Sequence, residues 1–355
     1  MRVCILGVGL SSYTLAKALV NQNIYVDIFP QKKKNLQDKS RTLGISKSNV
    51  EFFNNSIINI NKISWRLKKI EIFSDNLMKE KLINFHNNGT ELFSIIKNKD
   101  LFETLEKSLS KNKYFKKINP LNKLNSLNKY SLIINTDSTN VITKKYFSRK
   151  ILKEYNSIAY TTSIRHKKIC NDTAIQIFTK NGPLAFLPIS ESETSVVYSF
   201  KKNKGEDINH LIEKYNPKFK IQKIEKIKSF ELKSLNLRSY YYKNILAFGD
   251  LLHRIHPLAG QGFNMTIRDV KTLLEIVVKT HRLGLPLDSS ICYEFEKKSK
   301  HNNLIFSNGI DLVHEFFNFE RKINNNLISK TVQLLGKNSN INKLFTKIAD
   351  RGTLI

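Results

Sequence analysis

Apolar residues recur at two different spacings along the chain. Residues 2–6 form a short, mostly apolar run, and residues 10–20 repeat apolar side chains every three or four positions. The first pattern predicts a buried strand and the second an amphipathic helix. A further apolar run at residues 24–29 completes a strand–helix–strand unit. The chain therefore begins with the kind of unit from which helix-covered parallel sheets are built.

Two later segments repeat the pattern of a strand followed by a loop. Residues 132–135 form an apolar run that a polar loop follows. Residues 245–248 form another, which ends at Gly249 and Asp250. After a loop of small residues, Phe263 opens a segment with the apolar spacing of a helix. We expect both segments to belong to the same domain as the amino-terminal unit.

The middle of the chain has the spacing of a strand series. The expected strands are residues 174–178, 182–188 and 195–199. Asn181-Gly182 is the clearest of the turn sequences that separate them. From residue 288 to the end the pattern is mostly helical, and we expect its apolar face, with Ile310, Leu312, Val313, Phe316 and Phe317, to be packed in the core. The fold class is therefore α/β with an added sheet and a helical tail.

Composition narrows the class of protein. The chain has 355 residues, which suggests about two domains. The formal net charge of +29 would suit a nucleic-acid-binding protein. The lysines are spread along the chain, however, and no nucleic-acid-binding module is recognisable. Abundant Lys, Asn and Ile with only 7 Pro instead suit an AT-rich coding sequence. We expect no specific nucleic-acid partner.

Cysteine use and hydropathy set the expected cellular context. The cysteines, Cys4, Cys170 and Cys292, are scattered without a Cys-x-x-Cys spacing, so neither a disulfide framework nor a zinc site is indicated. No apolar run reaches the ~18 residues that span a bilayer, and residues 1–20 read as a folded unit rather than a signal peptide. We expect a cytoplasmic protein. Its basic surface would favour peripheral contact with anionic lipid headgroups on the inner face of a membrane.

Two glycine-containing turns carry the candidate chemistry. Gly7 and Gly9 lie between the first strand and the first helix, where glycine permits a tight turn and close approach to a pyrophosphate. Ser12 stands at the third position of this fingerprint and is small enough for a helix to pack closely on a strand. The small-residue loop after Asp250 lets backbone approach a flat ligand, and the helix that follows turns its free N–H groups toward negative charge. Together they predict a dinucleotide site.

The second turn resembles a known flavin motif. FAD-dependent aromatic hydroxylases carry Gly-Asp-Ala-Ala-His, then His-Pro, then Gly-Gln-Gly-x-Asn, and within that superfamily the segment is most similar to the ubiquinone-biosynthesis hydroxylases. The matching residues are Gly249, Asp250, His253, His256, Pro257, Gly260, Gln261, Gly262, Asn264, Arg268 and Asp269. The resemblance implies a Rossmann-like FAD-binding domain, an inserted substrate-side β-sheet domain and a helical carboxyl-terminal region.

The resemblance also implies a domain division and a set of cofactor-binding residues. The FAD-binding domain would take residues 1–65, 95–150 and 240–285, the substrate-side sheet residues 66–94 and 151–239, and the helical region residues 286–355. Arg41, Asn98 and Asp137 match weaker motifs, and Asn98 would also suit a helix N-cap. The implied cofactor-binding set is Gly7, Gly9, Ser12, Arg41, Asn98, Asp137, Gly249, Asp250, Pro257, Gly260, Gln261, Gly262 and Asn264, with no metal ligands.

The resemblance implies an enzyme whose chemistry resides in its flavin. NAD(P)H would reduce FAD, and O₂ would add to give a flavin C4a-hydroperoxide. This would hydroxylate a prenylated phenol or quinol in ubiquinone biosynthesis, alone or in a biosynthetic complex. His256 and Pro257 would line the flavin face, although His256 has the simpler alternative of holding the loop. A flavoprotein of the same fold with other chemistry, such as an epoxidase or a prenyl reductase, stays open.

Departures from the family pattern leave a third interpretation. The second strand ends at Phe29-Pro30 without the acid that would hold the adenosine ribose, and Asp27 lies inside the strand. In the motif that begins at Asp137, Ser138 replaces Gly and Lys144 replaces Arg. A degenerate FAD-binding subunit without catalysis would show losses of this kind.

Overall fold

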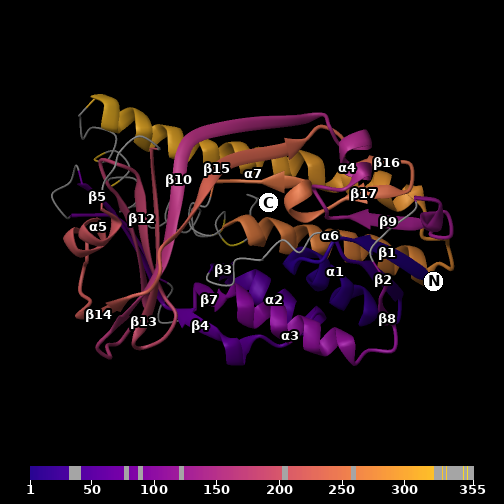
Figure 1. The fold of residues 1–355 in the computed structure, drawn as a ribbon, viewed down its shortest axis with the longest axis horizontal. Helices are drawn as coiled ribbons and strands as arrows, with labels where there is room; N and C mark the ends of the chain where they lie inside the picture. Colours follow the sequence, from indigo (N-terminus) through magenta and orange to yellow (C-terminus); the bar gives the residue numbers. More distant parts are fainter. Residues whose placement is uncertain are drawn as a thin grey trace.

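The computed structural model describes most of the chain. The described residues are 1–31, 41–75, 80–86, 91–119, 124–201, 207–256 and 261–323, with positions 330, 333, 347 and 350. A parallel sheet with helices lies at one end of the molecule and a larger, mostly antiparallel sheet at the other (Figure 1). The longest helix, α7 (Ser289–Ile323), runs along both (Figure 1). The α/β fold class expected from the sequence is confirmed.

Strands from three distant parts of the chain form the six-stranded sheet. Its order is β16-β17-β9-β1-β2-β8. The bounds are β1 (Arg2–Leu6), β2 (Tyr25–Phe29), β8 (Phe115–Lys117), β9 (Leu132–Asn135), β16 (Tyr241–Tyr242) and β17 (Ile245–Ala247). Strand β1 pairs in parallel with β2 and β9, and β9 with β17. The carboxyl ends of β1, β9 and β17 therefore meet at one edge of the sheet.

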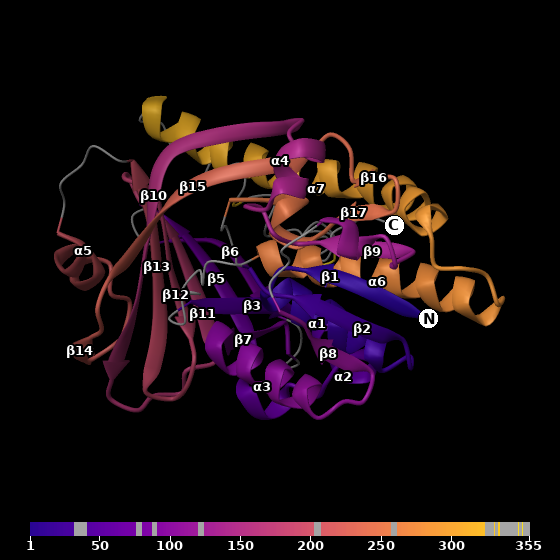
Figure 2. The ribbon, with the colours of Figure 1, turned by 45° about the vertical axis from the view of Figure 1, so that its right-hand side comes forward.

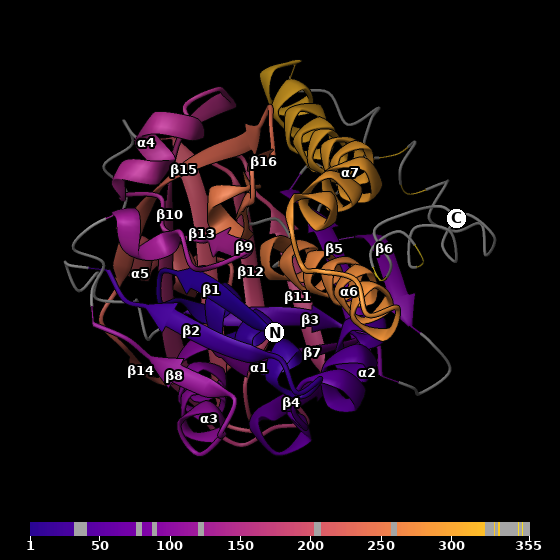
Figure 3. The same ribbon diagram turned by 90° about the vertical axis from the view of Figure 1, so that its right-hand side faces the viewer.

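Helices and a small second sheet surround these strands. The bounds are α1 (Leu10–Val20), α2 (Lys47–Ser56), α3 (Asn98–Ser110), α4 (Val141–Tyr146) and α6 (Gln261–Arg282), with β3 (Thr42–Ser46), β4 (Ser64–Leu67) and β7 (Phe93–Lys97) in the three-stranded sheet. Helix α6 begins at Gln261, two residues before the start expected from its apolar spacing. Leu15 and Leu19 of α1 and Ile267 and Val270 of α6 are buried in one apolar core with β1. Figure 3 shows α6 and α7 lying beside each other, to the right of β1 and β2.

The large sheet combines the strands from the middle of the chain with strands that come before and after them in the sequence. Its order is β18-β15-β10-β13-β12-β11-β5-β6, and β14 pairs with β10. The bounds are β5 (Lys69–Ser74), β6 (Lys81–His86), β10 (Lys150–His166), β11 (Thr173–Phe178), β12 (Pro183–Pro188), β13 (Glu193–Lys201), β14 (Ile221–Ile224), β15 (Lys228–Leu237) and β18 (His253–Arg254). Helix α5 (Ile208–Lys214) packs its apolar residues onto this sheet. Strands β10 and β15 extend from the large sheet toward α4 and β16, so they link the two ends of the molecule (Figure 2).

The apolar face expected to be core in the carboxyl-terminal helix is largely exposed. Phe295 and Phe306 in the first part of α7 are buried, but Leu312 is 70% exposed and Phe316 40% exposed. Val313 is exposed as well, and the side chain of Phe317 lies outside the described part. The expectation holds for Ile310, which is half-buried against core residues. It was wrong for Leu312, Val313 and Phe316, because α7 turns a polar side chain, Asp311, toward β10. Across the described stretches, no helix combines the length and apolarity needed to cross a bilayer.

Candidate functional site

The turns after β1, β9 and β17 pack against one another. Gly249 has a φ of +65°, and a Cβ added there would lie 2.7 Å from the Cβ of Ser11 in the first turn of α1. Gly7 has a φ of +104°, and its Cβ would lie 2.5 Å from Oγ1 of Thr136 in the turn after β9. Both positions combine a left-handed backbone with a space that admits only glycine. The structure therefore joins three motifs that are far apart in the sequence.

Ser12 ties the first helix to the turn after β9. Its side chain is buried, its Oγ accepts the Gly9 N–H at 3.3 Å, and it shares a 2.8 Å hydrogen bond with Oγ1 of Thr136. The close packing that glycine usually provides at this fingerprint position is thus reached with a bonded hydroxyl. The first turn of α1 holds no acidic residue, so the positive end of the helix dipole is not neutralised by a side chain of its own helix.

Asp250 projects from the same edge of the sheet. It lies in the short 3₁₀ turn of residues 249–251 that follows β17, and it is exposed. Among the described residues its carboxylate has no hydrogen-bond or ion-pair partner. A free carboxylate beside the Gly7 and Gly249 turns is in a position to accept hydrogen bonds from hydroxyl groups of a bound nucleotide.

Arg41 and Asn98 lie side by side. The N–H of Asn98 donates to the main-chain oxygen of Arg41 at 2.9 Å. The guanidinium of Arg41 stacks over the ring of Phe230 on β15, with 3.9 Å between its central carbon and the ring centroid. Lys97, not Asn98, is the N-cap of α3, so the expected capping role of Asn98 is wrong by one residue. Contact of either residue with a flavin stays a prediction.

Asp137 is held by its own turn. Its Oδ1 accepts hydrogen bonds from the N–H of Thr139 at 2.8 Å and from the Thr139 hydroxyl at 2.7 Å. Its main-chain oxygen accepts from the hydroxyl of Thr143. The side chain is 6% exposed. The carboxylate therefore stabilises the turn into α4, and its expected contact with the cofactor is a prediction only.

Asn264 joins α6 to β3 and α2. Its Nδ2 donates to the main-chain oxygen of Gly44 at 2.8 Å, and its Oδ1 accepts from the N–H of Ser46 at 3.0 Å and from Nδ2 of Asn49 at 2.9 Å. The side chain is completely buried. These three hydrogen bonds leave the side chain of Asn264 little capacity to bond a ligand. In this structure the residue therefore holds α6 against β3 and α2.

Of the motif residues Pro257, Gly260, Gln261 and Gly262, the structure describes the last two. Gln261 is buried at the start of α6. A Cβ on Gly262 would meet no atom within 4 Å, so packing alone does not require glycine there. Pro257 and Gly260 lie outside the described residues.

The two histidines of the motif have different surroundings. Nε2 of His253 lies 2.5 Å from Oδ2 of Asp269, whose other oxygen accepts from Nδ2 of Asn303 at 2.9 Å, and all three side chains are buried. The ring of His256 is buried and meets Tyr155 edge-on, with 4.9 Å between centroids. No group of three or more metal-ligating side chains occurs in the part of the chain that the structure describes. His253 therefore connects β18 to α6 and, through Asp269 and Asn303, to α7.

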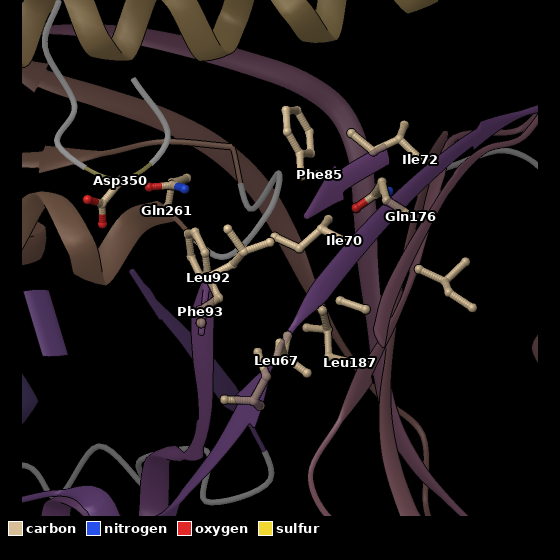
Figure 4. A pocket seen from close by; sticks show the side chains of 14 residues that line it. Leu67, Ile70, Ile72, Phe85, Leu92, Phe93, Gln176, Leu187, Gln261 and Asp350 are labelled. Atoms are coloured by element: carbon tan, nitrogen blue, oxygen red, sulfur yellow. The ribbon is translucent and has the colours of Figure 1, made fainter. Parts of the chain in front are cut away.

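A partly open apolar cavity lies between the three-stranded sheet and the large sheet (Figure 4). Its volume is about 130 Å³. The lining residues are Gly44, Leu67, Ile70, Ile72, Phe85, Leu92, Phe93, Ile95, Ala174, Ile175, Gln176, Leu187, Gln261 and Asp350. Gln261 and Asp350 lie near each other at one end, and Gln176 lies away from them (Figure 4). Sequence reasoning missed Asp350, because nothing in the local pattern around residue 350 marks it.

The acid inside β2 is occupied by structural contacts. Asp27 is 2% exposed, and its two oxygens accept from Nη1 of Arg2 at 2.9 and 3.0 Å. The hydroxyl of Tyr130 donates to Oδ2 of Asp27 at 2.6 Å, and burial, with this bond, raises the pKa of Tyr130. Asp27 is therefore not available for an adenosine ribose in this structure.

Taken together, these contacts fit FAD at one end of the site. Gly7, Gly9 and the start of α1 form a backbone turn at a positive helix end, as a pyrophosphate requires. Asp250 offers a free carboxylate next to that turn. The end where an adenosine would bind lacks the usual acid. The residues present thus suit the pyrophosphate and ribityl parts of the cofactor better than the adenosine.

Part of the chain matches a flavin-binding family. Residues 128–282 match the family described as FAD binding domain. The 3-demethoxyubiquinol 3-hydroxylase of Escherichia coli is 26% identical over 175 residues, covering 46% of this chain and 44% of the relative. The mitochondrial ubiquinone biosynthesis monooxygenase COQ6 of Drosophila melanogaster is 22% identical over 231 residues, covering 52% and 48%. The match spans about half of the length of these relatives or less.

Solved structures agree in fold over almost the whole chain. The p-nitrophenol 4-monooxygenase of Pseudomonas putida superposes with a TM-score of 0.78 at 10% identity, covering 98% of both chains. A probable FAD-dependent monooxygenase of Pseudomonas aeruginosa gives 0.70 at 13% identity, covering 95% of this chain and 99% of that one. At such identities the likeness shows the fold. Together with the sequence relatives it confirms the resemblance to FAD-dependent aromatic hydroxylases of the ubiquinone-biosynthesis type.

Proposed function

We propose that this chain is an FAD-dependent monooxygenase that hydroxylates the ring of a prenylated phenol or quinol in ubiquinone biosynthesis. The observation that carries the proposal is the meeting of the turns at Gly7, Thr136 and Gly249 in a chain that also has an apolar cavity. Gln261, from the same motif as Gly249, lines that cavity. A cofactor that extends from the turns to the start of α6 would therefore reach the cavity.

FAD, when bound, supplies the chemistry: it takes electrons from NAD(P)H and activates O₂. The protein's own groups bind and orient it. The turn of Gly7 and Gly9 and the start of α1 would hold the pyrophosphate through backbone N–H groups. Asp250 would accept hydrogen bonds from ribityl hydroxyls, and Arg41 would lie against the nucleotide while its stacking on Phe230 fixes its direction.

The cavity suits one aromatic ring. Its volume of about 130 Å³ is close to that of an engineered protein cavity of about 150 Å³ that binds benzene. Side chains such as Leu67, Phe93 and Leu187 make its wall apolar. An apolar wall excludes water from the reacting ring, as oxygen transfer from a flavin requires. A prenyl tail would have to extend beyond the cavity.

A spectrum of the purified protein tests the cofactor, and oxygen uptake tests the reaction. We expect flavin absorbance bands, and NAD(P)H oxidation coupled to O₂ consumption when a short-chain ubiquinol precursor is added. Turnover that continues without O₂ would favour a prenyl reductase of the same fold. Peripheral contact with the membrane that holds such a substrate, and membership of a ubiquinone-synthesis complex, follow from the proposed substrate and are predictions.

A second candidate is a non-catalytic flavin-fold subunit. The observations that favour it are the internal contacts of two acids: both oxygens of Asp27 are bonded to Arg2, and Oδ1 of Asp137 is bonded to Thr139. This candidate predicts a colourless protein that gains no bound absorbance when FAD is added in excess. A yellow protein that turns over substrate excludes it.

A further inference from the structure

Three buried side chains from three different elements form a chain of hydrogen bonds. Nε2 of His253, on β18, lies 2.5 Å from Oδ2 of Asp269, on α6. Nδ2 of Asn303, on α7, donates to the other oxygen of Asp269 at 2.9 Å. An ionised carboxylate only accepts hydrogen bonds, so Nε2 of His253 is the donor in the first bond. The orientation of the Asp269 carboxylate is therefore fixed from two sides.

The bond between His253 and Asp269 closes the stretch of chain that carries the second flavin motif. The two residues are 16 positions apart. Gly249 and Asp250 lie shortly before His253, and α6 begins at Gln261, on the side of Asp269. The bond therefore fixes the turn after β17 relative to the start of α6. Both of these carry residues of the proposed cofactor-binding set.

Helix α7 holds both sides of this closure. One turn after Asn303, Oγ of Ser307 accepts a hydrogen bond from Nδ2 of Asn236 at 2.9 Å. Asn236 lies on β15 directly opposite His253 in the antiparallel pair of β15 and β18. Asn303 thus holds the α6 side and Ser307 the strand side. The side chains of Asn303, Ser307 and Asn236 are buried, so water does not compete for these bonds.

Polar side chains at this contact serve geometry more than stability. A buried carboxylate loses its hydration, and apolar residues of similar volume often pack as stably in such a place. A bonded polar network, in contrast, specifies one arrangement, because its hydrogen bonds are satisfied only there. Without Nδ2 of Asn303, the Asp269 carboxylate would lose one of the two donors that fix its orientation. Its bond to His253 would then no longer be held in one geometry.

We infer that Asn303 is a positioning residue of the flavin site. It holds the Asp269 carboxylate in the orientation that receives His253, and through that pair it sets the position of Asp250 relative to the start of α6. In this role Asn303 acts from α7 without contact with the cofactor. The inference rests on the proposed function for the identity of the cofactor, FAD, and not for the reaction that follows.

Binding of FAD to two variants of the full-length protein tests this role. Equilibrium dialysis measures the affinity at a temperature where circular dichroism shows each protein to be folded. Asn303→Leu removes the donor and keeps a side chain of similar size, and we expect its affinity for FAD to fall about 3- to 30-fold. The second variant combines Asp269→Asn with Asn303→Asp. This exchange of amide and carboxylate allows both hydrogen bonds to form again, so it should recover most of the lost affinity.

The matched control is Asn308→Leu, the same substitution at an exposed position of α7, which should leave the affinity unchanged. If Asn303→Leu does not fold, Asn303→Ser withdraws the same donor without a larger apolar group and is measured in its place. A residue needed only for stability would lower the unfolding midpoint and leave the affinity of the folded variant unchanged. That result overturns the inference, and so does an exchange variant that binds FAD no better than the single variant.

Failure of the inference and failure of the proposed function give different results. Binding that depends on Asn303, in a protein that takes up no O₂ with substrate, leaves the inference standing and removes the proposed monooxygenase. Oxygen uptake with an affinity that Asn303→Leu does not change does the reverse. A protein that binds no FAD removes both.

Discussion

Gly249 packs so closely on Ser11 that a Cβ on Gly249 would lie 2.7 Å from the Cβ of Ser11. This contact connects the turn after β17 to the first turn of α1. Both turns belong to the proposed flavin site, although one comes from the beginning of the chain and the other from the second half. Packing of the Gly249 backbone against the Ser11 side chain therefore helps to set their relative position.

Alanine substitutions at two glycines of one motif should differ in their effect on stability. Gly249→Ala should lower the free energy of unfolding by about 2–3 kcal/mol, because it adds a clash with Ser11 to a left-handed backbone. Gly262→Ala should leave stability unchanged or raise it by up to about 1 kcal/mol, since it lies in α6 with no atom near the new Cβ. Chemical denaturation of both variants without added FAD measures the difference. Equal losses would contradict the packing argument.

Gly262→Ala also tests the flavin motif separately from the fold. If the cofactor approaches the start of α6, the added Cβ should weaken FAD binding in a variant that is as stable as the unmodified protein. Equilibrium dialysis against FAD provides the measurement. Unchanged affinity would remove Gly262 from the proposed binding set.

Removal of the Asn264 side chain should destabilise the protein even without flavin. Asn264→Ala leaves the N–H of Ser46 and the oxygen of Gly44 buried without partners. We expect a loss of about 3 kcal/mol. Asn308→Ala, at an exposed position on α7, is the matched control and should change stability by less than about 0.5 kcal/mol. A stable Asn264→Ala protein that only binds FAD poorly would show that the residue serves the cofactor instead.

Arg268 should be replaceable without loss of stability. Its Nη1 and Nη2 are buried without hydrogen-bond partners in the described part of the chain, and its guanidinium carbon lies 4.3 Å from the centroid of the Phe306 ring. Burial lowers the pKa of Arg268 to about 10, against the opposing charges of Asp269 and Asp350. Because the folded state holds a poorly solvated cation, Arg268→Met should keep or raise the free energy of unfolding, by about 1 kcal/mol. A clear decrease in thermal denaturation would mean that the contact with Phe306 outweighs the desolvation.

Thiol reactivity should separate one cysteine from the other two. Cys170 is exposed, whereas Cys4 and Cys292 are buried. Burial raises the pKa of Cys292 to about 12 and raises that of Cys4 as well, so both remain protonated thiols at pH 8. Because the thiolate is the reactive form, a disulfide reagent should modify one thiol in the native protein and three after denaturation. Cys170→Ser should abolish the native reaction, and a second fast thiol between pH 7 and 9 would contradict the burial.

Strands of the parallel sheet could be predicted because each of them is a short, continuous run of apolar residues. Strands β1 and β9 form over the residues expected, since a strand covered on both faces reads as a continuous apolar segment. The turn at Gly7 could be predicted from a local signal as well, because Gly7 directly follows the apolar run of β1. Periodicity did not show what an apolar face meets, however. Leu312 lies on a regular stripe of α7, yet that stripe faces outward because Asp311 on another side of the helix reaches Tyr155 and Lys153 of β10.

Parts of the site that depend on long-range contacts could not be predicted. The motif indicated that Asn264 lies near a flavin, but the choice of Gly44, Ser46 and Asn49 as its partners depends on how α6 meets β3. Asp350 shows the same limit more strongly. Its Oδ1 accepts the N–H of Ser48 at the start of α2, and no spacing rule relates two segments so far apart in the sequence.

The order of strands in the parallel sheet has a consequence for synthesis of the protein. Strand β1 leaves the ribosome well before two strands on one side of it in the sheet, because β9 ends at residue 135 and β17 ends at residue 247. At about 5–20 residues per second, translation needs roughly 12–50 s to reach β17. Throughout that interval the nascent amino-terminal segment exposes apolar side chains and unpaired backbone. Elongation rate and chaperone supply in the host should therefore affect the yield of protein.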